Sequence, residues 1–166
     1  MNGDGKLDLV AVSPAGRFDV LLAAAGGRLS AGLPYPTVGN PRSLVVLDAD
    51  ADGKMDVVIA GDGLQLHRGD GAGGFAAVAP AIVAPGSRLE SIALADVNRD
   101  RAPDLLGVSA GGMQVFRRVA GTFIPDALFA SGPGAHVVAA DLDGDGLPDA
   151  IVTGGSNAAV LRNDSR

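Results

Sequence analysis

A nine-residue pattern rich in aspartate occurs four times in the chain and strongly limits how the chain can fold. The clearest copy runs from Asp141 to Asp149 and reads DLDGDGLPD. Its last aspartate has counterparts at Asp8, Asp56 and Asp104, so the copies follow one another at intervals of 48, 48 and 45 residues. A repeat of this length is typical of solenoids and propellers, in which each repeat folds into one structural unit.

In the clearest copy, aspartates occupy positions 1, 3, 5 and 9. Alternate spacing turns the first three carboxylates toward a common centre, and Leu147 at position 7 offers its backbone carbonyl. Calcium accepts a crowded and irregular shell of such oxygen ligands, so the pattern predicts a calcium-binding loop. Gly146 at position 6 suits this tight loop, because glycine adopts a positive φ angle without steric cost.

The other copies match this pattern to different degrees. Residues 48–56 (DADADGKMD) keep every position and the glycine. Residues 96–104 (DVNRDRAPD) have Asn98 at position 3 and Arg101 in place of the glycine, at a backbone cost of about 1 kcal/mol. Residues 2–8 lack position 1 altogether. We expect cation occupancy to be highest in the two complete loops, lower in the loop with Arg101, and lowest in the truncated loop.

Short apolar runs surround every loop and predict strands buried on both faces. They precede the loops at 43–48, 91–96 and 136–141, and follow them at 8–12, 56–60, 104–108 and 149–153. A third run follows a Gly or Pro turn in each repeat, at 17–23, 64–68, 113–118 and 158–163. A weaker fourth segment comes next, at 28–33, 75–83 and 122–129. Four strands in each repeat of about 47 residues predict an all-β fold of the β-propeller type, and no segment predicts a helix.

The sequence predicts a single domain over residues 1–166, with incomplete repeats at both ends. The repeats fall at approximately 1–40, 41–88, 89–134 and 135–166. The first lacks a strand before its loop and the last ends after its third strand, so the predicted blades have three, four, four and three strands. Open strand edges pair readily with other chains. The chain is therefore expected to be part of a larger propeller or to assemble with another copy.

The composition excludes several other classes of protein. Hydrophobic residues make up 47% of the chain but aromatic residues only 4%, so the core must be built from Val, Leu, Ile and Ala. A net charge of −6 argues against nucleic acid as a partner. The absence of cysteine excludes disulfides and thiolate metal sites. No apolar run is long enough for a membrane span, and Met1 leads straight into a loop, so we expect no signal peptide in this chain.

The pattern D-x-[DN]-x-D-[GR]-x-x-D, with the apolar run after it, resembles the FG-GAP and VCBS-type repeats. Such repeats form the blades of integrin-α-like β-propellers and of many bacterial surface and secreted proteins, where the loop joins the innermost strand of a blade to the second and binds calcium. The resemblance implies a set of calcium ligands in which position 7 contributes its carbonyl. They are Asn2, Asp4, Lys6 and Asp8; Asp48, Asp50, Asp52, Lys54 and Asp56; Asp96, Asn98, Asp100, Ala102 and Asp104; and Asp141, Asp143, Asp145, Leu147 and Asp149.

The resemblance also implies a function. We expect a non-enzymatic binding or adhesion module that is extracellular, cell-surface or periplasmic, with a protein or carbohydrate ligand on the face opposite the calcium loops. On that face we expect the loops 39–42, 85–88 and 132–135, in which Arg42 and Arg88 fall at corresponding places. The alternative is a structural propeller segment of a larger secreted protein or enzyme, with no ligand of its own.

Three other interpretations of the acidic loops were weighed. An EF-hand needs an acidic residue at position 12, where this chain has Ile59, Gly107 or Val152. A pair of aspartates could act as the two catalytic carboxylates of a glycosidase. However, alternate aspartates within one tight loop that is repeated four times suit a bound cation better. One alternative stays open: Asp149 and its equivalents directly precede buried strands and would then only cap amides of the loop backbone.

Two further features have simpler explanations. Arg68, Gly69 and Asp70 spell the tripeptide that integrins recognise on their ligands, but the surrounding HRGDGAGG predicts a turn. The two histidines, His67 and His136, lie in different repeats without cysteine nearby. We interpret them as ordinary residues at strand ends, not as metal ligands or parts of a catalytic triad.

Overall fold

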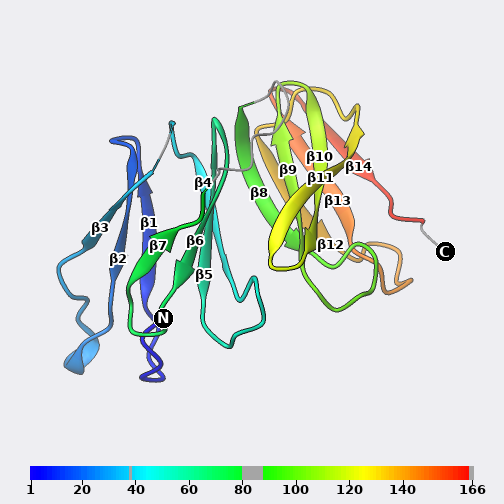
Figure 1. Cartoon of the computed structure of the whole chain (residues 1–166). Helices are drawn as coiled ribbons and strands as arrows, with labels where there is room; N and C mark the ends of the chain where they lie inside the picture. Colours follow the sequence, from blue (N-terminus) through cyan, green and yellow to red (C-terminus); the bar gives the residue numbers. More distant parts are fainter. Residues whose placement is uncertain (38, 80–87, 165–166) are drawn as a thin grey trace. The chain divides into compact units, whose positions relative to one another are not determined.

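The computed structural model describes residues 1–37, 39–79 and 88–164. These residues form fourteen strands in four antiparallel sheets, with one short 3-10 turn (Figure 1). The chain divides into two compact units, Met1–Val83 and Ala84–Arg166, and each unit holds two of the sheets. The predicted all-β fold is confirmed.

The first unit contains a three-stranded sheet followed by a four-stranded sheet. The three-stranded sheet has the order β1 (Leu9–Ser13), β2 (Arg17–Leu21) and β3 (Leu33–Pro36), with the 3-10 turn η1 (Ala25–Gly27) between β2 and β3. The four-stranded sheet has the order β4 (Ser43–Leu47), β5 (Asp56–Gly61), β6 (Gly63–Gly69) and β7 (Phe75–Ala77). Consecutive strands pair antiparallel, so each sheet is a simple meander.

The second unit repeats this arrangement in the reverse order. Its four-stranded sheet contains β8 (Leu89–Ala95), β9 (Asp104–Ser109), β10 (Gly112–Val119) and β11 (Thr122–Phe129). Its three-stranded sheet contains β12 (His136–Ala140), β13 (Asp149–Gly154) and β14 (Asn157–Leu161). The order of the strands in each sheet follows the order of the chain.

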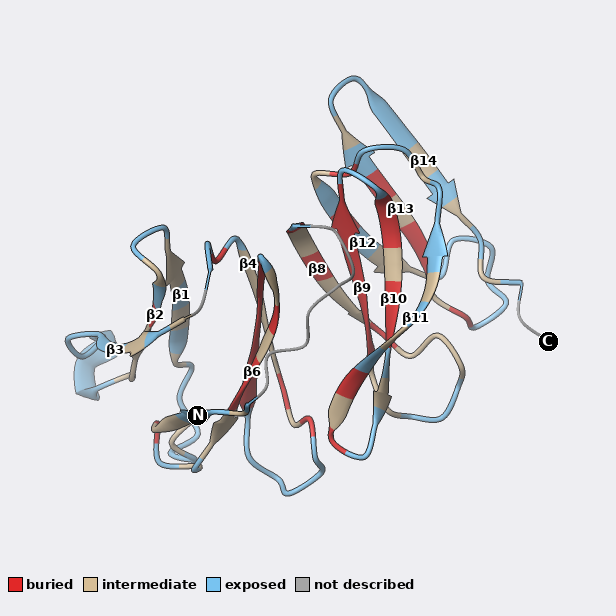
Figure 2. Cartoon of the chain, turned by 45° about the horizontal axis from the view of Figure 1, so that its top comes forward, coloured by how far each residue is buried: buried red, intermediate tan, exposed pale blue. Residues whose placement is uncertain are grey.

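An aromatic group lies between the two sheets of the first unit. Phe18 and Val20 alternate with polar residues along β2, as expected for a half-buried strand, and both are fully buried. Figure 2 marks the buried stretches of the strands in red. The Phe18 ring stacks on Tyr35 at 5.0 Å between centroids and meets His67 and Phe75 edge-on at 4.8 and 5.9 Å. Four of the chain's few rings thus hold these two sheets together.

The core of the second unit is aliphatic. One buried cluster takes residues from both sheets of this unit: Ala95, Leu106, Val108, Met113, Val115, Val137, Ala150 and Val152. The composition predicted a core of small and medium-sized aliphatic residues, and in this unit such side chains fill the space between the sheets.

The predicted strands agree closely with the observed ones in the first three segments of every repeat. The predicted pattern of three, four, four and three strands is confirmed. The prediction for 28–33 is wrong, since β3 begins only at Leu33. Two glycines of η1 take positive φ angles of 75° and 71°, which turn the chain away from β2, and Leu29 makes only an isolated bridge to Ala23.

Other predictions at the outer strands are met in part. The segment 122–129 forms β11 as predicted. The segment 75–83 contains β7, which ends at Ala77, while residues 80–83 lie outside the described part of the chain. Residues 85–87 of the predicted loop 85–88 also lie outside it. The expectation of no helix holds in the described residues except for the single turn η1.

We predict that Phe18→Ala lowers the free energy of unfolding by about 3–5 kcal/mol, because it leaves a cavity among three other rings. Leu128→Ala should change it by less than about 0.5 kcal/mol, because the Leu128 side chain is 65% exposed. Urea denaturation followed by circular dichroism at constant calcium measures both values. Equal effects of the two substitutions would show that the aromatic group does not hold the sheets together.

Candidate metal centre

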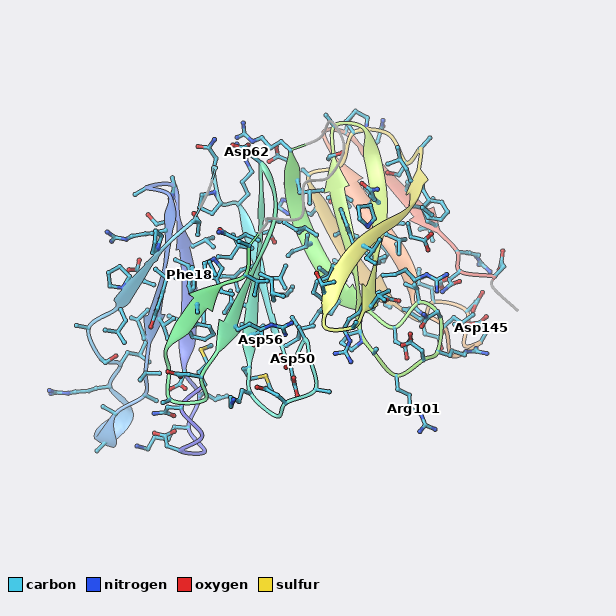
Figure 3. All side chains as sticks on the ribbon, viewed as in Figure 1. Phe18, Asp50, Asp56, Asp62, Arg101 and Asp145 are labelled. Carbon is cyan, nitrogen blue, oxygen red and sulfur yellow. The ribbon has the colours of Figure 1, made fainter. Side chains whose placement is uncertain are left out.

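Each acidic loop joins the first strand of a sheet to the second, apart from the first loop, which leads directly into β1. The loops therefore lie at one end of their sheets, and the hairpin that follows the second strand lies at the other end. In the second sheet, Asp50 and Asp56 lie at the loop end and Asp62 at the hairpin end (Figure 3). Antiparallel pairing brings this about, because consecutive connections alternate between the two ends of a meander.

The aspartate at position 9 clamps its loop to the end of the third strand. Asp56 is buried, and its Oδ1 accepts the N–H of Gly69 at 2.9 Å while its Oδ2 accepts the N–H of Ala49 at 3.0 Å. Asp149 is also buried and accepts the N–H groups of Asn163 and Leu142 at 2.9 and 3.0 Å. One carboxylate thus satisfies an amide of the loop and an amide 13 or 14 residues further along the chain.

The same clamp occurs in the other two repeats with different partners. Asp8 accepts the N–H of Ala23 at 2.8 Å, and its second oxygen binds the terminal amine of Met1 at 2.9 Å. Asp104 accepts the N–H of Arg118 at 2.7 Å, but its second oxygen is buried without a hydrogen bond. The alternative hypothesis is therefore right that position 9 caps backbone amides, whereas calcium binding by these four residues stays a prediction.

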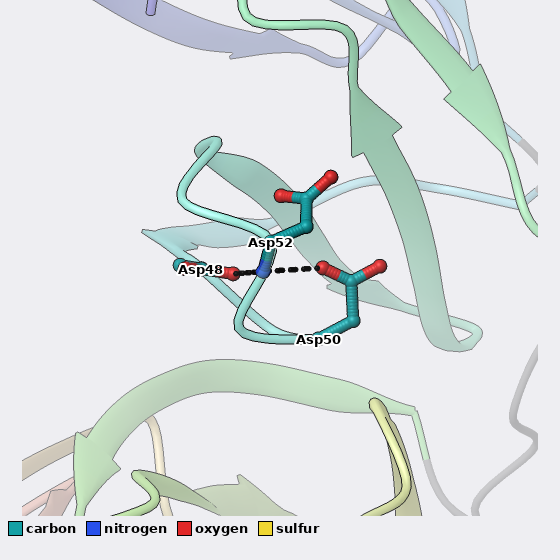
Figure 4. Close-up of side chains that lie close together, drawn as sticks. All are labelled: Asp48, Asp50 and Asp52. Atoms are coloured by element: carbon teal, nitrogen blue, oxygen red, sulfur yellow. Dashed lines mark hydrogen bonds between the residues drawn. The ribbon is translucent and has the colours of Figure 1, made fainter.

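Positions 1, 3 and 5 shape the loop through short hydrogen bonds to its own backbone. Asp48 accepts the N–H groups of Asp52 and Gly53 at 3.1 and 2.9 Å, and Asp50 also accepts the N–H of Asp52 at 3.3 Å (Figure 4). Asp52 in turn accepts the N–H of Lys54 at 2.9 Å. The equivalent bond from position 7 to position 5 occurs in all four loops, so these loops share one backbone path.

The carboxylates converge in the two complete loops. Asp48, Asp50 and Asp52 each offer an oxygen, and these oxygens lie within 4.8 Å of one another. Asp141, Asp143 and Asp149 form a second group by the same measure. The described residues of the other two loops form no such group of three. Oxygen-only groups of this kind fit a hard divalent cation, and calcium in particular tolerates their irregular arrangement.

The two groups differ in membership from the predicted ligand sets. Asp56 is absent from the first group, and its oxygens are bound by Ala49, Gly69 and Arg68. Asp145 is absent from the second group, and its Oδ1 is bonded to the N–H of Leu147 at 2.8 Å. The structure thus brings together three of the four predicted carboxylates in each complete loop.

Basic side chains lie among these carboxylates, and the sequence analysis missed them. Arg68 Nη1 lies 3.0 Å from Asp50 Oδ2 and 2.9 Å from Asp56 Oδ2. Arg162 Nη1 lies 3.1 Å from Asp143 Oδ2. Both arginines directly precede the residue whose N–H the position-9 aspartate accepts, so their shared place in the repeat was a usable signal. They offset part of the repulsion between the carboxylates.

Arg117 holds the same place in the third repeat but has another partner. Its Nε lies 2.7 Å from Asp126 Oδ2, on the neighbouring strand β11. In the first repeat the place is taken by Leu22. An arginine at this place therefore pairs with the acidic loop in the two complete loops.

Two positions in each loop require the left-handed backbone conformation. Position 6 was predicted, and there Gly146 has a φ of 83° and Arg101 one of 67°. Position 4 was missed, although Gly144 there has a φ of 81°, and Ala51 and Arg99 have 63° and 60°. The third loop thus holds two arginines in a conformation that costs roughly 1–2 kcal/mol per non-glycine residue, which makes it the most strained of the four.

The pKa shifts follow from these contacts. The side chain and amide of Lys54 lower the pKa of Asp52, and the amides of Asn163 and Leu142 lower the pKa of Asp149. Burial raises the pKa of Asp104 and the nearby charge of Asp100 adds to the rise, although the amide of Arg118 counters part of it. Asp104, which has a hydrogen bond to only one carboxylate oxygen, is thus harder to ionise than Asp149, which has a hydrogen bond to each oxygen.

The integrin-type tripeptide lies where β6 ends, and the prediction of a turn holds only from Asp70 onward, because Arg68 and Gly69 are the last two residues of β6. The guanidinium of Arg68 is bound to the acidic loop. The Oδ1 of Asp70 accepts the N–H groups of Ala72 and Gly74 at 2.7 and 2.9 Å. Both charged groups therefore serve local structure.

The histidines differ from each other. The expectation that His67 is an ordinary strand-end residue is wrong, because its side chain is buried within β6 against Phe18 and burial lowers its pKa. His136 is an exposed residue at the start of β12, as expected. Neither lies in an acidic group that would hold a metal ion in the described residues.

Four-stranded antiparallel meanders, joined at one end by repeated acidic loops, are blades of the β-propeller type. A family model described as FG-GAP-like repeat matches residues 1–59, 48–107 and 96–152. The chain belongs to the FG-GAP-like repeat family, and the resemblance found from the sequence is confirmed. No curated protein matches the chain.

Two solved structures have a similar fold. BBS1N, solved in complex with ARL6DN and soaked with lead, superposes with a TM-score of 0.62 at 12% identity, over 97% of this chain and 48% of that one. A lectin of Agrocybe aegerita that recognises non-reducing terminal N-acetylglucosamine superposes with a TM-score of 0.57 at 21% identity, over 95% of this chain and 49% of the lectin. The chain thus spans about half the length of both.

The described residues contain no candidate for a membrane-spanning helix.

We predict that two position-9 aspartates have opposite effects on stability at low pH in a calcium chelator. The pKa of Asp149 is lowered in the folded state, so its contribution is present above the unfolded pKa of about 3.9 and is lost as the pH falls through the folded pKa. The pKa of Asp104 is raised, so its titration favours the folded state increasingly as the pH falls from the folded pKa toward about 3.9.

Urea denaturation between about pH 6 and pH 2 tests this difference. Asp149→Asn should flatten the loss of stability in acid, and Asp104→Asn should steepen it, because each removes one titrating group. The same change of slope in both variants would contradict the contrast between the two clamps.

Proposed function

We propose that the chain is a calcium-stabilised, non-enzymatic binding module of an extracellular, cell-surface or periplasmic protein. The observation that carries the calcium part is the convergence of three carboxylates in each complete loop, within 4.8 Å of one another. Family membership supports it, because the acidic loops coincide with the matched repeats.

Electrostatics give the cation a structural role. Asp48, Asp50 and Asp52 repel one another, and Arg68 and Lys54 offset this repulsion at Asp50 and Asp52. Both basic side chains are partly exposed, so water and salt weaken these pairs. A divalent cation would give the same carboxylates a stronger and more central partner. The loop would then be fixed between its two strands.

A ligand would bind at the opposite end of the sheets, where the described residues of the connections hold no such group of three carboxylates. In the second sheet this end is ordered by Asp62, whose Oδ2 accepts hydrogen bonds from the amide group and the N–H of Asn40 at 2.9 and 3.3 Å. Arg42 lies beside Asn40, in the segment that leads into β4. The proposed ligand is a protein or a carbohydrate, and the lectin fold makes glycans a sensible first set to screen.

The second candidate is a structural propeller segment without a ligand of its own. Its support is that the chain spans about half of each matched structure, 48% and 49%. A glycan array and a pull-down with the complete parent protein separate the two candidates, because a purely structural segment captures nothing that depends on its own surface residues.

We predict that calcium raises the melting temperature relative to chelator. Extracellular sites have dissociation constants of about 0.1 to 1 mM, so calcium at about 1 mM is at one to ten times the dissociation constant and linkage gives about 0.4–1.4 kcal/mol per site. Differential scanning calorimetry in millimolar calcium and in chelator measures the shift. Asp52→Ala should reduce the shift more than Asp4→Ala, which alters the truncated loop and serves as the matched control.

The same melting temperature in both solutions would contradict the proposal for calcium. It would leave the fold and the position-9 clamps unaffected, because these need no cation.

We also propose that the chain associates through its incomplete sheets. In the described residues, β1 and β14 each pair on one edge only, and exposed apolar residues occur on both strands, among them Leu9 and Val160 at 47% and 56%. We predict a dimer or larger species in sedimentation velocity at high micromolar concentration. A clean monomer at that concentration would contradict it.

A further inference from the structure

An ionisable side chain, His67, is buried between the two sheets of the first unit. It belongs to β6 and is only 2% exposed. The ring of Phe18, from β2 of the neighbouring sheet, meets the imidazole edge-on at 4.8 Å between centroids. The proposed cation and ligand sites do not involve this ring, so they do not explain why an ionisable group lies here.

The side chains around His67 carry no negative charge. Within its own sheet, His67 pairs with Val57 of β5 and with Ala77 of β7, and side chains at paired positions point to the same face of a sheet. Phe18 packs against it from the other sheet and stacks on Tyr35. These neighbours suit a neutral imidazole and offer no partner to an imidazolium.

The charged side chains of the neighbouring strands point away from His67 and bind one another. On β2, Arg17 Nε lies 3.2 Å from Asp19 Oδ2, and both residues alternate with the buried Phe18. Arg68 of β6 and Asp56 of β5 lie 2.9 Å apart. Each directly adjoins a residue whose side chain faces the other sheet, so both point to the opposite face.

The remaining strands of the unit bring one further titratable side chain. On β3, Tyr35 donates its hydroxyl to the carbonyl oxygen of Gly73 at 3.2 Å. The sequences of β1, β4 and β7 contain no titratable residue. Asp8, which precedes β1, lies 2.9 Å from the terminal amine of Met1. The strands around His67 thus supply no carboxylate to balance a charge on its ring.

A proton on His67 would bury an uncompensated charge. A neutral imidazole has one donor and one acceptor nitrogen, whereas both nitrogens of an imidazolium are donors. Nε2 is buried, and no group of the described residues forms a hydrogen bond with it. The proton would therefore add a charge and an unsatisfied donor to this space. Burial lowers the pKa of His67 for the same reason.

The direction of the pH dependence follows from this difference between the folded and unfolded chain. A histidine in an unfolded chain has a pKa of about 6.5, and the pKa of His67 in the folded unit is lower. The unfolded state therefore binds the proton first as the pH falls. Stability is fully present above about pH 7 and is lost as the pH falls from about 6.5 toward the folded pKa.

We propose that His67 is an acid-sensitive switch for the contact between the two sheets of the first unit. In mildly acidic solution, proton uptake shifts the unit toward a form in which these sheets separate, because Phe18 covers the ring and must move before the imidazolium reaches water. The chain has two histidines, and the other, His136, is exposed. The second unit therefore has no equivalent device. The switch is a regulatory property beyond the proposed binding function and needs no cation.

Tyr35 reports on this contact without any label. It is the only tyrosine of the chain, which has no tryptophan, and it stacks on Phe18 at 5.0 Å. Its near-ultraviolet circular dichroism band, followed during urea denaturation in a calcium chelator, gives the unfolding equilibrium constant of the first unit. Between about pH 7 and about pH 5 this constant should rise by up to about tenfold per pH unit, which is the slope for one proton. Carboxyl groups ordinarily titrate near about 4, below this range.

Three variants assign the effect to one ring. His67→Phe and His67→Leu remove the titrating group and keep an apolar side chain against Phe18, so the unfolding constant should no longer change over this pH range. His136→Gln is the matched control, because it removes the exposed histidine and should leave the pH dependence unchanged. The tyrosine band at about pH 8 shows whether each variant is folded.

Nuclear magnetic resonance of the imidazole signals gives a second measurement on the unchanged chain, with His136→Gln assigning the signals. We expect His67 to titrate below about 6.5. Titration at or above that value would overturn the proposal, because the surrounding rings would then stabilise the imidazolium. An unfolding constant that does not change with pH in the unchanged chain would also overturn it, as would the same pH dependence in His67→Phe and His67→Leu. The chelator makes both measurements independent of the proposed calcium sites.

Discussion

The remaining structure depends on the hydrogen bonds that the aspartate at the end of each acidic loop accepts from backbone amides. In the clearest cases, Asp56 and Asp149, one carboxylate accepts an N–H from its own loop and another from the end of the third strand. The bonds hold the loop and the third strand to the start of the second strand. A buried carboxylate that accepts two amide hydrogen bonds is well satisfied, so the clamp needs no cation and repeats wherever the chain repeats.

The differences between repeats follow from what surrounds this clamp. The complete loops combine converging carboxylates with Arg68 or Arg162 beside them. The third loop has Arg99 and Arg101 in the left-handed conformation and a buried oxygen of Asp104 without a partner. The four loops thus share one backbone conformation although they differ in charge and in backbone strain.

Much of this could be predicted from the sequence, because strand periodicity, turn residues and alternate aspartates are local signals. The strands beside the loops and the incomplete sheets at both ends were found in this way. The start of β3 was misjudged, because the glycines of η1 set it and no alternation marks it. The burial of His67 and the pairing of Arg68 with Asp50 depend on contacts between distant segments. The strand pattern alone does not encode such contacts.

The most direct test of this account is a crystal structure at limiting calcium, with the anomalous signal measured at each loop. If converging carboxylates determine binding, signal should appear at residues 48–56 and 141–149 first, then at 96–104, and last at 2–8. The groups at Asp48 and Asp141 supply the oxygens for the first two. Signal at residues 2–8 without signal at 141–149 would contradict the account, because the truncated loop holds only two carboxylates, Asp4 and Asp8.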